Sequence, residues 1–136
     1  MDVMLPAGET ARAPGGKPPG DPRDTALALA ALLRDCRAQD VAVLDLLECN
    51  SWTSFFVIAT AASIAQLRGL ERHVKDFCRE RDLEILRHSP RLRLSTEDDD
   101  WRLTDLGAVV VHLMSERARN FYELERLWSA APRIFP

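Results

Sequence analysis

The segment from Ala108 to Met114 is the feature of this 136-residue chain that constrains its fold most. Its sequence is Ala-Val-Val-Val-His-Leu-Met, an almost unbroken apolar run. Successive side chains of a strand point to opposite faces of a sheet, so this run needs cover on both faces. That pattern is typical of a central strand between layers of helices. It predicts an α/β fold.

Apolar periodicity divides the rest of the chain into further helices and strands. Helices are expected at about residues 24–37, 63–81 and 115–131, and strands at residues 41–46, 54–60, 84–87, 101–106 and 108–114. The order α-β-β-α-β-β-β-α predicts a mixed sheet of about five strands with flanking helices. Ser63 and Ser115 are the expected caps of the last two helices. The strand at residues 84–87 is expected at an edge of the sheet.

Two of these helices carry patterns that assign their inner faces. In the helix from Ser63, the apolar residues at steps of three and four are Ile64, Leu67, Leu70, Val74, Phe77 and Cys78. Its exposed side is expected to hold two i,i+4 ion pairs, Glu71 with Lys75 and Arg72 with Asp76. In the last helix, the expected inner residues are Phe121, Leu124 and Trp128.

The first 23 residues differ in composition from the remainder. They contain five prolines and four glycines, and their charged residues cancel. Such a segment cannot bury enough apolar surface to offset its chain entropy. We expect residues 1–23 to be a disordered leader and residues 24–136 to be one folded domain.

Charge and cysteine content exclude several classes of protein. The chain has 18 Lys and Arg against 21 Asp and Glu, a formal net charge of −3, so charge alone does not favour nucleic-acid binding. No apolar stretch is long enough to span a membrane. Cys36, Cys49 and Cys78 form no disulfide framework, which indicates a reducing compartment. We therefore expect a cytoplasmic protein without sequence-specific contacts to nucleic acid.

Motifs for catalysis are missing from the sequence. It contains none of the spacings GxGxxG, GxxxxGK[ST], HExxH or GxSxG. Asp98 and Asp100 have a spacing that could hold Mg²⁺, and Asp105 follows, but an exposed acidic turn is the favoured interpretation. His112 is expected to be a packed side chain with one hydrogen bond. We expect no catalytic residue, no cofactor and no metal.

Large apolar residues beside charges indicate an interaction surface. By the period of two, Trp101, Leu103 and Asp105 share one face of their strand. Trp101 follows acidic residues at the entrance of the strand, where burial is often partial. A partly exposed tryptophan flanked by charge is typical of an interface hot spot. For Trp101, partner binding and a place in the core both remain open.

The order of motifs resembles the ribosomal silencing factor family, also called Iojap-like. The stretches that carry the resemblance are residues 37–45, Trp52-Thr-Ser-Phe-Phe-Val-Ile-Ala-Thr60, Trp101-Arg-Leu-Thr-Asp-Leu-Gly107, residues 110–114 and Glu116-Arg-Ala-Arg-Asn-Phe-Tyr-Glu-Leu-Glu-Arg-Leu-Trp128. Together they cover about residues 24–131. The resemblance implies a truncated nucleotidyltransferase fold without its acidic site, and no enzymatic activity.

The same resemblance implies a steric mechanism. Members bind protein fourteen of the large ribosomal subunit, prevent the small subunit from joining and so repress translation. Homodimers of the free factor are common in the family. The implied contact strand is Trp101, Leu103, Asp105 and Leu106, with Tyr122, Glu123 and Glu125 as further contacts. Trp101 would be the apolar anchor, and Asp105 would accept a basic side chain of the partner. The alternatives are a residual nucleotidyltransferase-like enzyme and a dimerising scaffold that does not bind ribosomes.

This chain departs from the family's pattern at several positions. Ser54 and Phe55 stand where Asp-Tyr is usual, Ala61 stands for Gly, and Ala108 stands for Asp. The Glu-Gly pair expected before Trp101 is absent. These changes leave two alternatives, a compensated partner surface or weakened ribosome binding, and the retained C-terminal motif favours the first.

Overall fold

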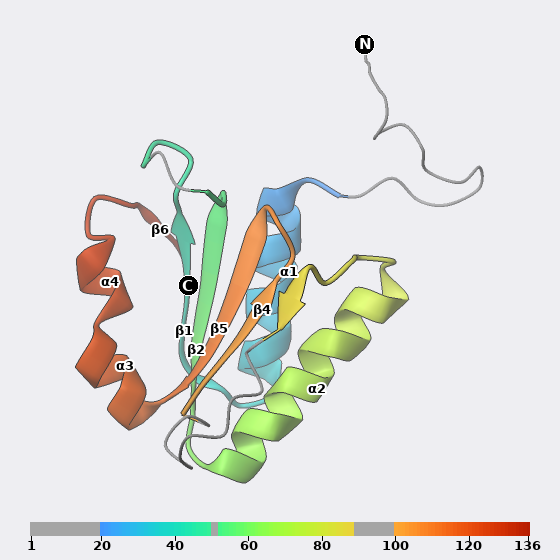
Figure 1. Ribbon diagram of the computed structural model, residues 1–136, viewed down its shortest axis with the longest axis vertical. Coiled ribbons are helices and arrows are strands. Elements are labelled where there is room, and N and C mark those ends of the chain that lie inside the picture. The colour runs from blue at the N-terminus through green and yellow to red at the C-terminus, as the bar shows by residue number, and fades with distance from the viewer. Residues whose placement is uncertain (1–19, 50–51, 89–99) are drawn as a thin grey trace.

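The computed structural model of the protein describes residues 20–49, 52–88 and 100–136 (Figure 1). In chain order its elements are α1 (Pro22–Asp35), β1 (Gln39–Asp45), β2 (Phe55–Ala61), α2 (Ile64–Glu80), β3 (Arg87–His88), β4 (Trp101–Asp105), β5 (Val109–Ser115), α3 (Glu116–Tyr122), α4 (Leu124–Leu127) and β6 (Arg133–Phe135). The expected order of elements is confirmed as far as α3. A short helix and a sixth strand follow it. Residues 1–19 of the expected leader lie outside the described residues.

Side-chain caps fix where the helices begin. The hydroxyl groups of Ser63 and Ser115 each accept a backbone N–H three residues later at 3.0 Å, which confirms both expected caps. The first helix begins earlier than expected. Asp21 caps it by accepting the N–H of Arg23 at 3.0 Å, and Pro22 occupies the first turn. Proline suits that position because the first N–H groups of a helix have no partner within it.

The strands form one mixed sheet in the order β3-β4-β5-β2-β1-β6. The pair β2 and β5 is parallel, and every other neighbouring pair is antiparallel. The apolar run at residues 108–114 forms β5, between β4 and β2, as its composition predicted. The two-residue strand β3 lies at one edge, where the edge strand was expected. These positions put β4 one strand away from that edge.

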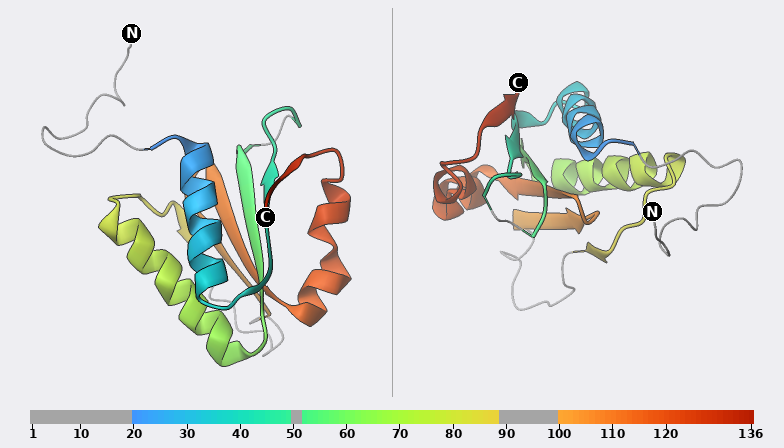
Figure 2. Two further views of the ribbon diagram at one scale, coloured as in Figure 1. Left: turned by 180° about the vertical axis from the view of Figure 1, so that it is seen from behind. Right: turned by 90° about the horizontal axis from the view of Figure 1, so that it is seen from above.

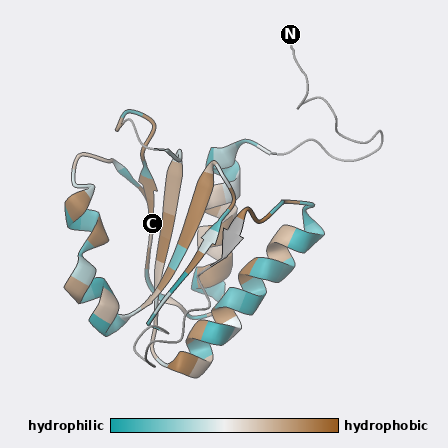
Figure 3. Cartoon of the chain, in the orientation of Figure 1, coloured by the Kyte–Doolittle hydropathy of each residue, from teal (hydrophilic) through white to brown (hydrophobic). Residues whose placement is uncertain are grey.

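Two apolar clusters fill the space on either side of the sheet. On one face, α1 and α2 cover β1, β2 and β5, with Val109, Val111 and Leu113 pointing toward them. On the other face, α3 and α4 lie against Phe56, Ile58, Val110 and Met114. Figure 2 shows α1 and α2 together on one side of the sheet. Figure 3 shows that the strands are mostly apolar and that the outer side of α2 is hydrophilic.

The C-terminal helix differs from the single helix expected at residues 115–131. Glu123 adopts a left-handed conformation, with φ 50° and ψ 54°, and separates α3 from α4. This break changes the direction in which the following side chains point. Leu124 is buried as expected and Trp128 is half-buried, but Phe121 is 77% exposed. The prediction that Phe121 belongs to the core is therefore wrong.

Candidate functional site

Strand β4 presents different side chains to the two faces of the sheet. Trp101 and Leu103 are half-buried and pack beside the cluster under α3 and α4. Arg102 points the other way and forms an ion pair with Glu71 of α2, at 3.2 Å. The alternation that the sequence predicted for this strand is confirmed. Tyr122 of α3 contacts Trp101 at the start of β4, and both Trp101 and Leu103 remain partly exposed. Strand β4 therefore presents a partly exposed apolar surface on this face.

The ring of Trp101 is fixed by two neighbours. Its indole Nε1–H donates a hydrogen bond to Nδ1 of His112 in β5, at 3.1 Å. Its ring centroid lies 4.7 Å from the ring of Tyr122 in α3. A partly exposed tryptophan that is held in this way presents a rigid apolar surface, and rigidity lowers the entropy cost of binding.

His112 is buried at the centre of this arrangement, as the sequence analysis expected. It is 4% exposed, and burial lowers its pKa to about 4. The imidazole is therefore neutral at pH 7. Because Nδ1 accepts the hydrogen bond from Trp101, the proton is assigned to Nε2. Within the described part of the chain, Nε2 is buried and has no hydrogen-bond partner.

The aromatic contacts extend beyond Trp101 in both directions. We call this set of rings the aromatic strip; its members are Trp52, Phe56, His112, Trp101, Tyr122 and Phe121. Neighbouring ring centroids in it are 4.5–6.4 Å apart. Both ends reach the surface, since Trp52 is 61% exposed and Phe121 is 77% exposed. Exposed apolar area of this kind is typical of a protein interface.

Asp105 occupies a different position from the one expected of a partner contact. It is 4% exposed, and its Oδ1 accepts the N–H of Gly107 at 2.8 Å. Gly107 has φ +93°, a conformation that favours glycine, and its carbonyl accepts a hydrogen bond from Thr53. Asp105 thus stabilises the turn between β4 and β5. Buried in this turn, it is not placed to reach a partner's side chain.

The remaining expected contacts are distributed around the site. Leu106 is half-buried and packs against the cluster on the α1 and α2 face, not beside Trp101. Glu123 is exposed and pairs with Arg126 at 3.1 Å. The structure therefore brings Tyr122 to Trp101 and Leu103, while Leu106 points to the opposite face. Glu123 and Glu125 follow Tyr122 beyond the end of α3.

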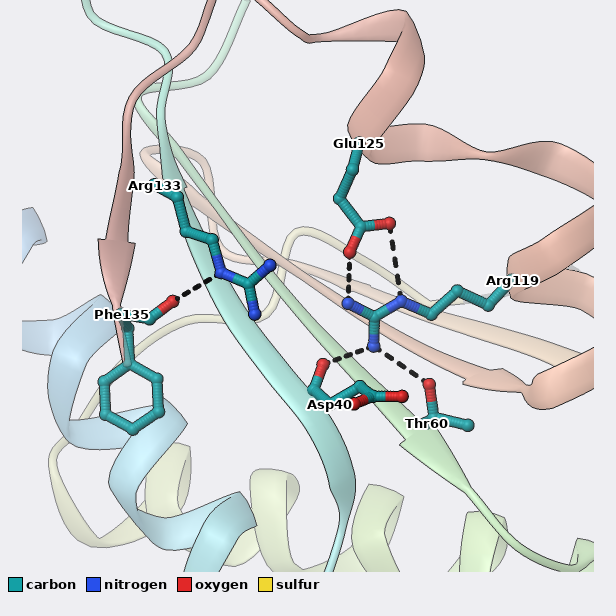
Figure 4. A network of polar contacts seen from close by, with 6 residues as sticks. All are labelled: Asp40, Thr60, Arg119, Glu125, Arg133 and Phe135. Carbon is teal, nitrogen blue, oxygen red and sulfur yellow. Dashed lines mark hydrogen bonds and ion pairs between the residues drawn. The ribbon is translucent and has the colours of Figure 1, made fainter.

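A buried arginine that the sequence analysis did not single out holds the C-terminal segment in place. Arg119 donates to the carbonyl oxygen of Asp40, to the hydroxyl of Thr60 at 2.9 Å and to both carboxylate oxygens of Glu125 (Figure 4). Burial opposes ionisation of Glu125, but the hydrogen bond and charge of Arg119 outweigh it and lower the pKa of that carboxyl. This network borders an open groove of about 610 Å³. In the sequence, Arg119 could have been identified from the Arg-x-Phe-Tyr part of the family motif, which begins at this residue.

The acidic residues considered for a metal do not converge. Asp98 lies outside the described residues. Asp100 pairs with Arg117 at one end of β4, and Asp105 lies at the other end, about 16 Å away by the rise of an extended strand. Among the described residues, no group of three or more His, Cys, Asp or Glu could hold a metal ion. No described helix has the length and apolar character needed to cross a membrane.

Comparison with known proteins gives consistent matches over most of the chain. The family model described as "Ribosomal silencing factor during starvation" matches residues 19–135. The ribosomal silencing factor RsfS of Treponema pallidum is 40% identical over 103 residues, which cover 76% of this chain and 88% of that protein.

Two further matches extend this comparison. A Mus musculus protein named "Mitochondrial assembly of ribosomal large subunit protein 1" is 31% identical over 74% of this chain and 43% of its own length. A crystal structure of a Chromobacterium violaceum protein has a TM-score of 0.67 and 29% identity, covering 78% and 85% of the two chains. The fold and the sequence therefore agree on the same relatives.

Proposed function

Because this chain belongs to the ribosomal silencing factor family, we propose that it binds protein fourteen of the large ribosomal subunit and blocks the joining of the small subunit. Translation is repressed as a result. The name of the mouse relative, which refers to the large ribosomal subunit, supports the choice of subunit. We infer a cytoplasmic location, where bacterial ribosomes are found.

The observation that carries this proposal is the partly exposed ring of Trp101, held against His112 and Tyr122. Tryptophan and tyrosine are over-represented among interface residues whose truncation weakens binding most. Leu103 adds apolar area beside them, since it is also half-buried on the same face. A specific interface needs about 800 Å² on each partner, which a sheet face of this size can supply.

The mechanism that we propose is steric and uses no cofactor. Trp101, Leu103 and Tyr122 form the apolar centre of the contact, and Glu123 contributes exposed negative charge at its rim. Complementary charge raises the rate of encounter with a basic partner such as a ribosomal protein. Asp105 contributes indirectly, because its hydrogen bond to Gly107 fixes the turn that follows β4. Leu106 and Glu125 remain weaker candidates for direct contact.

Sedimentation of mixed ribosomal subunits tests the proposal. Purified large and small subunits at physiological salt should yield fewer joined ribosomes when this protein is added first. The protein should comigrate with large subunits and not with small subunits alone. An unchanged fraction of joined ribosomes would contradict the proposed block. Failure to comigrate with large subunits would contradict the proposed partner.

Self-association through the aromatic strip is the second candidate. It is favoured by the exposed rings of Trp52, Tyr122 and Phe121, which a second copy could cover. Sedimentation equilibrium of the free protein would measure it. If self-association and large-subunit binding use the same surface, adding large subunits should dissociate the dimers, and the protein should then bind the large subunits as a monomer. A dimer that never comigrates with large subunits would support the scaffold alternative instead.

The enzymatic alternative can be tested separately. A nucleotide site would stabilise the folded state, so millimolar nucleotide with Mg²⁺ would raise the melting temperature. The opposite-end positions of Asp100 and Asp105 on β4 argue against a shared metal between them. We therefore expect no shift in melting temperature.

A further inference from the structure

The outer side of α2 carries a row of cations. Arg68, Arg72, Lys75 and Arg79 follow one another at intervals of four, three and four residues, which places them along one side of the helix. We call this row the basic stripe. The three arginines are exposed and Lys75 is partly exposed. In Figure 3, much of the α2 ribbon has the hydrophilic colour, with apolar residues between.

The acidic residues of α2 do not neutralise this stripe. Glu71 was expected to pair with Lys75 on the exposed side, but it is 7% exposed and pairs with Arg102 beneath the helix. That expectation is wrong. Asp76 pairs with Arg79, at 2.6 Å, rather than with Arg72. Glu71 is thus turned inward and Asp76 is used at the end of the stripe. The third carboxylate of α2, Glu80, is the last residue of the helix and follows the stripe.

Arg72 and Lys75 are consequently left without an ion pair within the described part of the chain. This is a local excess of positive charge on a protein whose formal net charge is −3. Neighbouring unpaired cations on a rigid helix complement closely spaced negative charges. The phosphates of a nucleic-acid backbone have this arrangement, and lysine and arginine bind them without regard to base sequence.

The position of α2 relates the stripe to the surface of β4. Consecutive residues of β4 face in opposite directions: Trp101 toward the aromatic strip, and Arg102 toward Glu71 of α2. The stripe therefore lies on the layer behind β4, close to the same edge of the sheet. A large partner that contacts Trp101 and continues around this edge would meet α2.

We infer that the basic stripe, chiefly Arg72 and Lys75, binds RNA phosphates of the large subunit while the β4 surface binds its protein partner. This inference rests on the proposed function. The contact is sequence-independent and supplementary, because two cations bind phosphate too weakly to act alone. It adds a salt-dependent component to the affinity, since each neutralised phosphate releases counterions.

The test measures affinity for intact large subunits between 50 and 200 mM salt. The native protein is compared with the double variant Arg72→Gln, Lys75→Gln. Two lost phosphate contacts remove about 1.4–1.8 from the slope of log affinity against log salt. Across this range the native protein should therefore lose about tenfold more affinity than the variant. Binding to isolated protein fourteen should be equal for both proteins.

A control variant separates position from charge. Arg34→Gln, Arg37→Gln removes two exposed positive charges at the end of α1 and should keep the native slope. Equal slopes for the native protein and the α2 variant would overturn this inference and leave the proposed function standing. A loss of affinity that is the same at every salt concentration would also overturn it, because it would indicate a hydrogen-bonded protein contact. A native protein that does not bind large subunits would overturn both proposals.

Discussion

Trp101 and His112, on the adjacent strands β4 and β5, are joined by a hydrogen bond of 3.1 Å between the indole Nε1–H and the imidazole Nδ1. The two residues are diagonal neighbours, because Leu103 lies directly opposite His112 in the register. The bond requires a neutral imidazole with a free lone pair on Nδ1. The orientation of the partly exposed Trp101 ring therefore depends on the protonation state of the buried His112.

Acidification is expected to destabilise the protein through His112. Its pKa is about 4 in the folded protein and 6.5 in the unfolded chain, so the unfolded state binds more protons between these values. The contribution of neutral His112 to the free energy of unfolding is fully present above pH 6.5 and is lost as the pH falls to 4. The total loss over this range is about 3 kcal/mol. Urea unfolding at pH 7, 5.5 and 4.5 measures it.

The variant His112→Phe is the control for this effect. In this variant, the free energy of unfolding should no longer change between pH 6.5 and 4.5, but it should still fall at lower pH. The lowered pKa of Glu125 stabilises the folded protein above the range in which a free carboxyl titrates. This contribution is lost only as the pH falls through that range toward the lowered pKa, and it remains in the variant. A variant that shows the native pH dependence would mean that His112 is not its source.

Truncation of the tryptophan should weaken binding to the large subunit. Trp101→Ala removes the ring that contacts Tyr122 and is expected to cost about 2 kcal/mol or more of binding free energy, roughly 30-fold in affinity. The control is Val74→Ala, which removes buried apolar volume from the opposite face, at about 2 kcal/mol of folding free energy. Val74→Ala should bind normally. Normal binding by a folded Trp101→Ala would show that β4 is not the contact strand.

The network around Arg119 should contribute more to stability than an exposed ion pair does. Breaking a buried pair costs about 3–5 kcal/mol, and the partial exposure of Glu125 reduces this to about 2 kcal/mol. Arg119→Gln is expected to lower the free energy of unfolding by that amount. Arg119→Lys should recover only part of it, because an ammonium group lacks the planar set of donors that reaches three acceptors. Full recovery with lysine would mean that charge alone accounts for the effect.

Two glycines provide a matched pair of substitutions. Gly107→Ala should destabilise the protein by about 1–2 kcal/mol, because its φ is +93° and a Cβ would lie 3.3 Å from Leu86. Gly69→Ala should stabilise it by about 0.5–1 kcal/mol, because Gly69 is inside α2 and a Cβ there would contact nothing within 4 Å. Thermal unfolding of both variants measures the two changes. Effects of the same sign would contradict this explanation.

The parts of the fold that depend on local sequence were predictable. The apolar run of β5 required cover on both faces, and the serines at residues 63 and 115 could be recognised as caps from their place before helical periodicity. Alternation along β4 correctly placed Trp101 and Leu103 on one face. Each of these inferences depends on residues that are close together in the sequence, and sequence periodicity describes such residues well.

The errors come from contacts that the periodicity of a helix or a strand does not include. Glu71 had a suitable helical partner in Lys75, but Arg102, 31 residues later, binds it instead. Residue 123 is a glutamate, not the glycine or asparagine that usually marks a left-handed conformation, so the sequence did not signal the helix break there. The hydrogen bond from Arg119 to Glu125 spans this break. Asp105 was expected to contact a partner because the family resemblance implied it, but its carboxylate accepts the N–H of Gly107 in the turn after β4.

The last strand has a consequence for chains that are still being synthesised. β6 pairs with β1, whose residues are made some ninety positions earlier, so one edge of β1 stays open until the final residues are added. An unpaired strand edge can pair with another chain and so promotes aggregation. Products of premature termination before Arg133 would therefore expose this edge, and they should be poorly soluble even though they contain every residue of the proposed binding surface.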